Sequence, residues 1–353
     1  MHIEELVKGI KAPSYELGEK LQKRLDNLTK PRGSLGRLEE MAKLVGIIQG
    51  TLHPQIKRKV SFVVAGDHGV AEEGVSAYPQ EVTRQMVLNF LRGGAGINVL
   101  ARFAGSEVIV IDAGVKGEID AESPNFRKRK IREGTDNFCK GPAMSREEAI
   151  ESIETGIKVF EEEWEKGKID LVGVGEMGIA NTTSASAITS VITGETAEEV
   201  TSRGTGINDE KLKKKIAVVE KAINLNKPDP TDPIDILHKL GGFEIGVMTG
   251  IILASCYHRT PVLMDGFIST SSALLASLFS PHVKEYLIAS HLSVEKGHKF
   301  QLEYLGKKPL LQLDLRLGEG TGAVLGMMIV EAGIRILEEM ASFDSAGVSR
   351  EKG

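Results

Sequence analysis

Cysteine is scarce in this sequence, and the scarcity limits the redox and metal chemistry that the chain supports. Only Cys139 and Cys256 are present, too few for a disulfide framework or for a cysteine-based zinc site. The first 20 residues are charged throughout and lack the apolar core of a secretory signal. We therefore expect a cytoplasmic protein whose two thiols are reduced and buried.

An excess of basic charge and a membrane-length apolar run are also missing. The chain carries 44 Lys and Arg against 49 Asp and Glu, a formal net charge of -5, so it has no basic field of the kind that binds nucleic acid. Its most apolar stretch, residues 243–268, is interrupted by Glu244, by Gly250 and by the polar residues 257–259, which favours buried core over a membrane span. We expect neither a nucleic-acid partner nor a membrane span.

Several common catalytic signatures do not occur. The sequence has no G-x-x-x-x-G-K-[ST] phosphate loop, no H-E-x-x-H and no G-x-S-x-G. His68, His291 and His298 stand in segments without close metal-ligand spacing. Such histidines are more often held by a neighbouring Asp or a backbone carbonyl, so we predict no metal and no bound cofactor.

Helical segments and short apolar runs alternate along the chain. Six runs are expected to form strands. The first begins at residue 59, and the others span 107–115, 169–178, 261–267, 285–293 and 309–317. Strands that are apolar on both faces and separated by helices predict a parallel sheet covered on both sides. Five or six strands suit an open, doubly wound α/β sheet better than a closed eight-stranded barrel. At 353 residues the chain is long enough for a second, smaller domain.

Polar residues follow each expected strand, where ligands of open parallel sheets bind. These segments are residues 66–69, 112–115, 173–183, 265–272, 289–298 and 318–322. Two of them place a glutamate directly after a glycine, at Gly175–Glu176 and Gly318–Glu319. The repeated pattern predicts two carboxylates facing one cleft.

The segment around Glu176 also matches G-x-G-x-x-G through Gly173, Gly175 and Gly178, the fingerprint of dinucleotide binding. The fingerprint requires a second strand that ends in an acid roughly 20 residues on, and residues 184–200 contain no convincing strand. An NAD-dependent oxidoreductase therefore remains the alternative hypothesis.

A phosphate cradle is the favoured interpretation of this loop. Gly178 and the backbone N–H groups near Asn181 and Thr182 can hold a phosphate at the start of the next helix. Lys215 and Arg316 are candidate cations for it, although the neighbours of Lys215 in "KLKKK" are typical of a solvated helix face.

Taken together, these motifs resemble the nicotinate-nucleotide:dimethylbenzimidazole phosphoribosyltransferase family, which acts in assembly of the lower nucleotide loop of cobalamin. The resemblance extends in order over nearly the whole chain. It rests on "TKPRGSLGRLEEMA" (29–42), "AGDHGV" (65–70), "EGVSAYPQEVTRQMV" (73–87), "RGGAGINVLAR" (92–102), "GVGEMGIANTTSA" (173–185), "RGTGI" (203–207), "DGFI" (265–268), "SHLSVEKGH" (290–298) and "LDLRLGEGTGA" (313–323).

The resemblance implies a reaction and two catalytic residues. Its members transfer the phosphoribosyl group of nicotinate mononucleotide to 5,6-dimethylbenzimidazole, releasing nicotinate with inversion at C1′. The glutamate of the "GEGTG" motif, Glu319 here, is implied as the general base, and Glu176 as a second acid that orients the ribose. A non-catalytic nucleotide-binding regulator on the same fold is a further alternative.

The resemblance also assigns the remaining site residues and the assembly. The nucleotide and its phosphate are implied to contact Gly175, Gly178, Asn181, Thr182, Lys215, Ser293 and Arg316. The benzimidazole pocket is implied to include Tyr78, Gln85, Met86 and Leu317. The implied assembly is a homodimer of Rossmann-like subunits, each with a small helical domain (residues 1–55 and 331–353) and a large catalytic domain (residues 56–330).

Overall fold

A single parallel sheet organises the computed structural model, which describes residues 2–204 and 206–349. Residue 1 and residues 350–353 of the expected small domain, and Thr205 of the "RGTGI" motif, lie outside the described residues. The strands of the described chain are β1 (Lys59–Gly66), β2 (Glu107–Gly114), β3 (Phe126–Lys128), β4 (Leu171–Met177), β5 (Val262–Met264) and β6 (Leu287–Ala289). They pair in the order β3-β2-β1-β4-β5-β6, with every pair parallel. This is the doubly wound order, which confirms the predicted fold class.

Both faces of the strands are buried. In β1, Val60 and Phe62 enter one hydrophobic cluster, whereas Val63 and Ala65 enter another on the opposite face. A run of β-branched and aromatic residues without polar alternation therefore suits a strand that helices cover on both sides.

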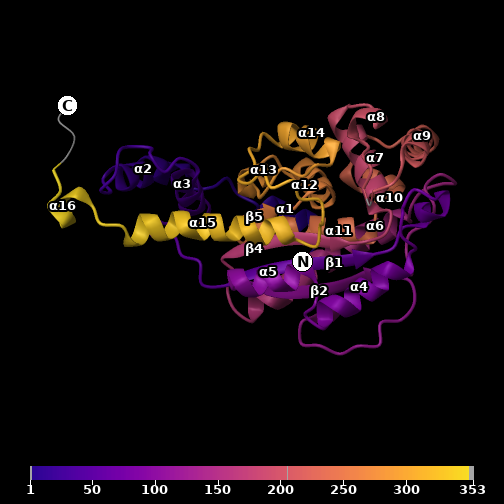
Figure 1. The fold of residues 1–353 in the computed structure, drawn as a ribbon, viewed down its shortest axis with the longest axis horizontal. Helices are drawn as coiled ribbons and strands as arrows, with labels where there is room; N and C mark the ends of the chain where they lie inside the picture. The colour runs from indigo at the N-terminus through magenta and orange to yellow at the C-terminus, as the bar shows by residue number, and fades with distance from the viewer. Residues whose placement is uncertain (1, 205, 350–353) are drawn as a thin grey trace.

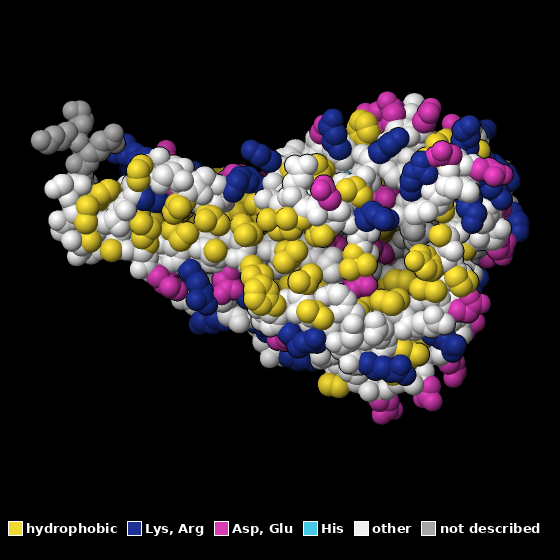
Figure 2. Space-filling view, in the orientation of Figure 1, with side chains coloured by type: hydrophobic (Ala, Val, Ile, Leu, Met, Phe, Trp, Pro, Cys, Tyr) yellow, Lys and Arg dark blue, Asp and Glu magenta, His cyan; other side chains and the backbone are white. Residues whose placement is uncertain are grey.

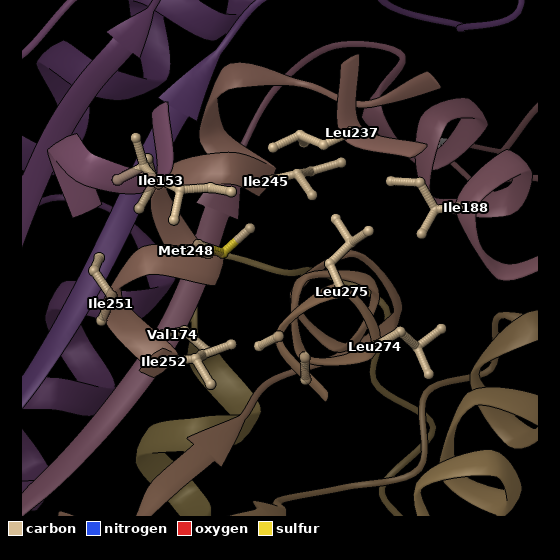
Figure 3. Packing of buried hydrophobic residues seen from close by; sticks show 14 of the residues in the cluster. Ile153, Val174, Ile188, Leu237, Ile245, Met248, Ile251, Ile252, Leu274 and Leu275 are labelled. Atoms are coloured by element: carbon tan, nitrogen blue, oxygen red, sulfur yellow. The ribbon is translucent and has the colours of Figure 1, made fainter. Parts of the chain in front are cut away.

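The first face of the sheet is covered mainly by α6 (Arg146–Glu165), α11 (Phe243–Tyr257) and α12 (Phe267–Phe279). Figure 3 shows Ile153 of α6, Val174 of β4 and Leu275 of α12 gathered around α11. Nearly every residue of α11 is buried. The apolar stretch at 243–268 is thus core, and no helix in the described part of the chain is long and apolar enough to cross a membrane.

The second face packs against α4 (Glu81–Leu91), α5 (Gly96–Ala104) and α15 (Thr321–Glu339). The helix α15 begins at the sheet and continues outward as the spine of an arm (Figure 1). Leu337 near its end shares a small core with α2 (Gly18–Asp26) and α3 (Arg37–Gln49), and α16 (Phe343–Ala346) lies at the tip. By contrast, α1 (Ile3–Gly9) buries Ile3 and Leu6 in the core of the sheet.

The remaining helices connect these layers. They are η1 (Tyr15–Leu17), η2 (Gly69–Glu73), α7 (Asn181–Thr193), α8 (Ala197–Val200), α9 (Asp209–Asn226), α10 (Pro233–Leu240), α13 (Val283–Tyr286) and α14 (Lys296–Leu305).

One expected strand is wrong. Residues 309–317 run beside β6 and make a single bridge, between Leu311 and His291. A left-handed backbone at Asp314, with φ of 54°, ends the extended conformation there. The sixth strand is instead β3, three residues long and set in a polar segment that gives no strand pattern.

Candidate active site

The polar strand ends meet at the middle of the sheet. The strands β1 and β4 are neighbours there, and the chain continues from β1 toward β2 on one side and from β4 toward β5 on the other. This reversal is the topological switch point, outside which open α/β sheets bind their ligands. Glu176 is the penultimate residue of β4, and Glu319 stands two residues before the start of α15.

The two Gly-Glu motifs are in direct contact. A Cβ on Gly175 would collide with the backbone of Gly320, and a Cβ on Gly318 would collide with Oε1 of Glu176. Gly318 also has a φ of 81°, which favours glycine. The structure therefore brings the carboxyl groups of Glu176 and Glu319 to one place, and glycine permits the approach.

Glu176 is buried and favours its protonated form. One carboxyl oxygen, Oε2, accepts a hydrogen bond from Nδ2 of Asn181. Burial raises the pKa of Glu176 to about 8, and the carboxylates of Glu244, Asp265 and Glu319 add to the rise while Asn181 opposes it. A carboxyl group with this pKa donates a hydrogen bond near neutral pH.

Glu319 is buried in a strained backbone conformation, with φ of 63°. Its Oε2 accepts a hydrogen bond from the backbone nitrogen of Ile97, at 3.1 Å, in the first turn of α5. Burial raises the pKa of Glu319, Asp265 adds to the rise, and the N–H groups of Ile97 and Gly96 oppose it. The carboxylate thus contacts the positive end of α5 and lies beside, without capping, its own helix α15.

Asp265, just after β5, fixes the loop that carries Glu319. Its Oδ2 accepts a hydrogen bond from the nitrogen of Gly320 at 3.0 Å. Its Oδ1 accepts from Gly322 at 2.6 Å and from Ala323 at 3.2 Å. The sequence marks Asp265 only as a polar residue at a strand end, because its three partners lie more than 50 positions away.

A second cluster surrounds Lys215 of α9, whose ammonium group is buried. Its Nζ donates to Oγ1 of Thr182 at 2.7 Å and to the carbonyl oxygen of Ser202 at 3.3 Å. Burial lowers the pKa of Lys215 to about 8, and Glu295 opposes the fall. Arg316 is exposed, and its guanidinium donates to the carbonyl oxygen of Gly204 at 3.3 Å.

Gly204 lies next to both cations. Its carbonyl oxygen accepts from Arg316, and a Cβ on it would lie 3.2 Å from Nζ of Lys215. Thr182 and Asn181 are neighbours in the first turn of α7, so the Lys215 cluster adjoins the carboxyl pair. The structure therefore places five of the predicted residues along one surface at the strand ends: Glu176, Asn181, Thr182, Lys215 and Arg316.

Ser293 is held by a neutral histidine. Its backbone nitrogen donates to Nδ1 of His298 at 2.9 Å, and Nε2 of His298 lies 3.1 Å from Oγ1 of Thr270. Burial lowers the pKa of His298 to about 3, with His291 contributing, so the ring is uncharged and its proton sits on Nε2. Among the described residues, no three His, Cys, Asp or Glu side chains are arranged to hold a metal ion.

The glycines of G-x-G-x-x-G have packing roles. A Cβ on Gly173 would lie 2.9 Å from Cε of Met327 in α15, and one on Gly178 would collide with the carbonyl oxygen of Gly66 in β1. Close packing of β4 against its neighbours therefore accounts for these glycines without a dinucleotide.

The residues expected to bind the benzimidazole are more dispersed. Leu317 is exposed and lies beside Gly96, at the same helix start that contacts Glu319. Met86 packs in the cluster that includes Met177, next to Glu176. Tyr78 is 56% exposed and Gln85 is exposed, and the contacts seen for these two side chains do not place them against Glu319.

Sequence reasoning missed a buried hydrogen-bonded pair behind the site. Nε2 of His68, after β1, lies 2.6 Å from Oε1 of Glu244, in the first turn of α11. A Cβ on Gly242 would lie 2.5 Å from Oε2 of Glu244, so glycine makes room for the pair. His68 is thus held by a glutamate 176 positions away and not by an adjacent group.

Comparisons with known proteins agree over almost the entire chain. A family model described as "Phosphoribosyltransferase" matches residues 10–348. A protein of Geotalea uraniireducens (strain Rf4) is 56% identical over 94% of this chain and 93% of its own length. One of Geobacter sulfurreducens is 54% identical over 95% and 94%. Both are named nicotinate-nucleotide–dimethylbenzimidazole phosphoribosyltransferase.

Solved structures agree with the fold. The crystal structure of CobT from Thermus thermophilus superposes with a TM-score of 0.91 and 46% identity, covering 95% of this chain and all of that one. A second structure from the same organism, titled with the phosphoribosyltransferase name, gives a TM-score of 0.90 at 45% identity, over 95% of this chain and 99% of that one.

Proposed function

Because this chain belongs to the nicotinate-nucleotide–dimethylbenzimidazole phosphoribosyltransferase family, we propose that it transfers the 5-phosphoribosyl group of nicotinate mononucleotide to 5,6-dimethylbenzimidazole. The products are α-ribazole 5′-phosphate, a precursor of the cobalamin lower ligand, and nicotinate. The observation that carries the proposal is the meeting of the two Gly-Glu motifs at the switch point, in a chain that matches this family over its length.

The proposed chemistry is a displacement at C1′ of the ribose with inversion. One ring nitrogen of the benzimidazole forms a bond to C1′ while the bond to the pyridinium nitrogen breaks, and that electron pair returns to the nicotinate ring. The attacking azole becomes cationic, so the proton on its other nitrogen must leave. Glu319 accepts this proton, a role that typically contributes ~10²–10⁴-fold to the rate.

The environment of Glu319 supports this role. Burial and Asp265 raise the pKa of Glu319, which makes the carboxylate a stronger base. The N–H groups of Ile97 and Gly96 oppose the rise, and the bond from Ile97 orients the carboxylate.

Glu176 has a different proposed role, because its pKa of about 8 keeps it protonated. A buried carboxylic acid beside Glu319 donates a hydrogen bond, and the ribose hydroxyls are acceptors of suitable size. We assign Glu176 to orienting the ribose. Two neighbouring carboxyl groups in different protonation states are a recurrent way to divide such tasks.

The Lys215 cluster is the proposed phosphate site. The first turn of α7, with Asn181 and Thr182, provides N–H groups and the positive end of the helix. Lys215 and Arg316 add two cations within reach of the loop at Gly204. Gly175, Gly178 and Ser293 complete the proposed nucleotide contacts, and Tyr78, Gln85, Met86 and Leu317 the proposed benzimidazole contacts.

We also propose that the active form is a homodimer. Figure 2 shows a band of hydrophobic side chains along the arm and across the middle of this face. On α5, Val99 and Phe103 are 54% and 73% exposed, one turn apart on the same side of the helix. A second subunit would cover this apolar surface, and the arm, built from residues of both chain ends, would serve as the predicted small domain.

The direct test is incubation of the purified chain with nicotinate mononucleotide and a panel of azole bases, with mass detection of the riboside phosphates. The proposal expects α-ribazole 5′-phosphate and one nicotinate per turnover. Absence of product would favour a nucleotide-binding regulator, and an absorbance change with NAD and candidate alcohols would favour the oxidoreductase.

A further inference from the structure

A cleft of about 380 Å³ lies between α3 and the outer strand of the sheet, β6. Its lining comes from three segments: Arg37, Glu40, Met41, Lys43, Leu44 and Ile47 of α3, Leu287–Ala289 of β6, and Gly306, Lys307 and Lys308 after α14. None of these residues belongs to the proposed transfer site, which lies at the ends of β1 and β4. The volume is in the range of small-molecule sites.

The lining is strongly cationic. It contains four basic side chains, those of Arg37, Lys43, Lys307 and Lys308, and a single acid, Glu40. Glu40 is paired with Arg37, which also donates to the carbonyl oxygen of Lys308 at 2.7 Å. One acid cannot balance four cations, so the cleft has a net positive charge.

Lys307 is the least satisfied of these cations. It is partly buried, and its ammonium group makes no hydrogen bond with any described residue, whereas Nζ of Lys43 donates to Oε1 of Gln22 at 3.2 Å. The buried Nε of Arg37 also has no partner among the described residues. Arg37 is paired with Glu40 through another nitrogen, and the described lining offers Lys307 no anion of its own, although partly buried cations are normally paired.

Electrostatics at Lys307 agree with this geometry. Burial lowers the pKa of Lys307 to about 8, and Arg37 adds to the fall, while Glu285, Cys256 and Glu40 oppose it. The acids near Lys307 therefore leave its charge only partly compensated. A bound anion would restore the ordinary pKa and gain the corresponding free energy.

The rest of the wall is apolar and selects the kind of anion. Met41, Leu44, Ile47, Leu287 and Ile288 present hydrocarbon to the cleft. Leu44 is partly exposed there, while the other four side chains are buried beneath the cleft floor. A ring or short chain attached to the charge would cover Leu44, which a bare inorganic ion would leave against water.

We propose that this cleft binds a small organic anion, with its carboxylate at Lys307 and its apolar body against Met41 and Leu44. The site is separate from the transfer reaction and does not depend on it. Benzoate is a suitable probe because it combines one carboxylate with one ring, and benzamide is its uncharged match.

Competitive acetylation tests the proposal in the full-length chain. Limiting acetic anhydride at pH 8 labels Lys307, and Lys299, which is 70% exposed on α14 and outside the cleft, is the internal control. At ten times its Kd, benzoate occupies all but about one site in eleven, so labelling of Lys307 falls about tenfold. Labelling of Lys299 stays constant, and benzamide protects neither.

Calorimetry with variants gives an independent readout. Lys307→Met weakens benzoate binding at least about tenfold because it removes a charge-assisted contact, whereas Lys299→Met binds as the wild type does. Thermal unfolding confirms that Lys307→Met is folded. The proposal is overturned if benzoate fails to protect Lys307, if it protects Lys299 equally, or if benzamide protects Lys307 as well as benzoate does. It is also overturned if folded Lys307→Met binds benzoate with unchanged affinity. Shielding of Lys307 by a second subunit, with no benzoate competition, would do so as well.

Discussion

Replacement of Asp265 by asparagine tests how Glu319 is held in place. Asp265 is the only acceptor shown for the N–H groups of Gly320, Gly322 and Ala323 in the described structure. Asparagine has one acceptor oxygen and one NH₂ group. Whichever way the amide is turned, at least one buried N–H group then faces another donor.

The magnitude follows from these bonds. A hydrogen bond to a charged group contributes about 1.5–3 kcal/mol, and a buried unsatisfied donor costs about 1–3 kcal/mol. We therefore expect Asp265→Asn to lower the free energy of unfolding by about 2.5–6 kcal/mol. Because Glu319 directly precedes Gly320, the loop shift also moves its carboxylate, and a displacement of about 1 Å costs about 10²-fold in kcat.

The assay compares kcat and the free energy of unfolding with those of Asp112→Asn. Asp112 is also a buried carboxylate near the end of a strand, where its Oδ1 accepts from the nitrogen of Val115 at 2.9 Å. We expect Asp112→Asn to lose stability and keep its kcat, whereas folded Asp265→Asn loses both with little change in the KM for nicotinate mononucleotide. A wild-type kcat in Asp265→Asn would refute the reasoning.

Three further predictions concern charge and assembly. Burial raises the pKa of Glu176 from 4.5 to about 8, so the folded state binds an extra proton and the free energy of unfolding falls as pH rises through this window. Glu176→Gln should flatten that fall when thermal unfolding is followed across pH. An unchanged pH profile would contradict the assignment. Lys215→Ala should raise the KM for nicotinate mononucleotide at least tenfold, which corresponds to a loss of about 1.4 kcal/mol or more of binding free energy. Lys214→Ala, at an exposed position of the same helix, is the control. Equal KM values in the two variants would remove Lys215 from the phosphate site. Phe103→Glu should shift sedimentation toward monomer, whereas Leu225→Glu, on α9 and 51% exposed, should not; a dimer in both variants would exclude α5 from the interface.

The sheet could be predicted because its strands are short apolar runs between amphipathic helices. The alternating leucines of 309–317 gave a false strand prediction, because the positive φ of Asp314 leaves no mark in the hydrophobic periodicity. The strand β3 went unrecognised for the opposite reason, because three residues pairing with β2 at a sheet edge need no apolar pattern.

Only part of the candidate site could be predicted from the sequence. Glu176 and Glu319 stood out because the strand-end rule converts a sequence position into a place in space. No pattern could show that Gly175 packs on Gly320 or which lysine of "KLKKK" is buried, because both depend on elements that are distant in sequence. The pairing of His68 with Glu244 lacked any sequence signal for the same reason.

Proton removal by Glu319 is the central claim, and the rate of α-ribazole 5′-phosphate formation by Glu319→Gln tests it most directly. Glutamine keeps the size of the side chain and one acceptor for the nitrogen of Ile97, but it cannot accept the azole proton. We predict that the variant binds nicotinate mononucleotide as the wild type does and forms product ~10²–10⁴-fold more slowly. Product formation at the wild-type rate would contradict the account.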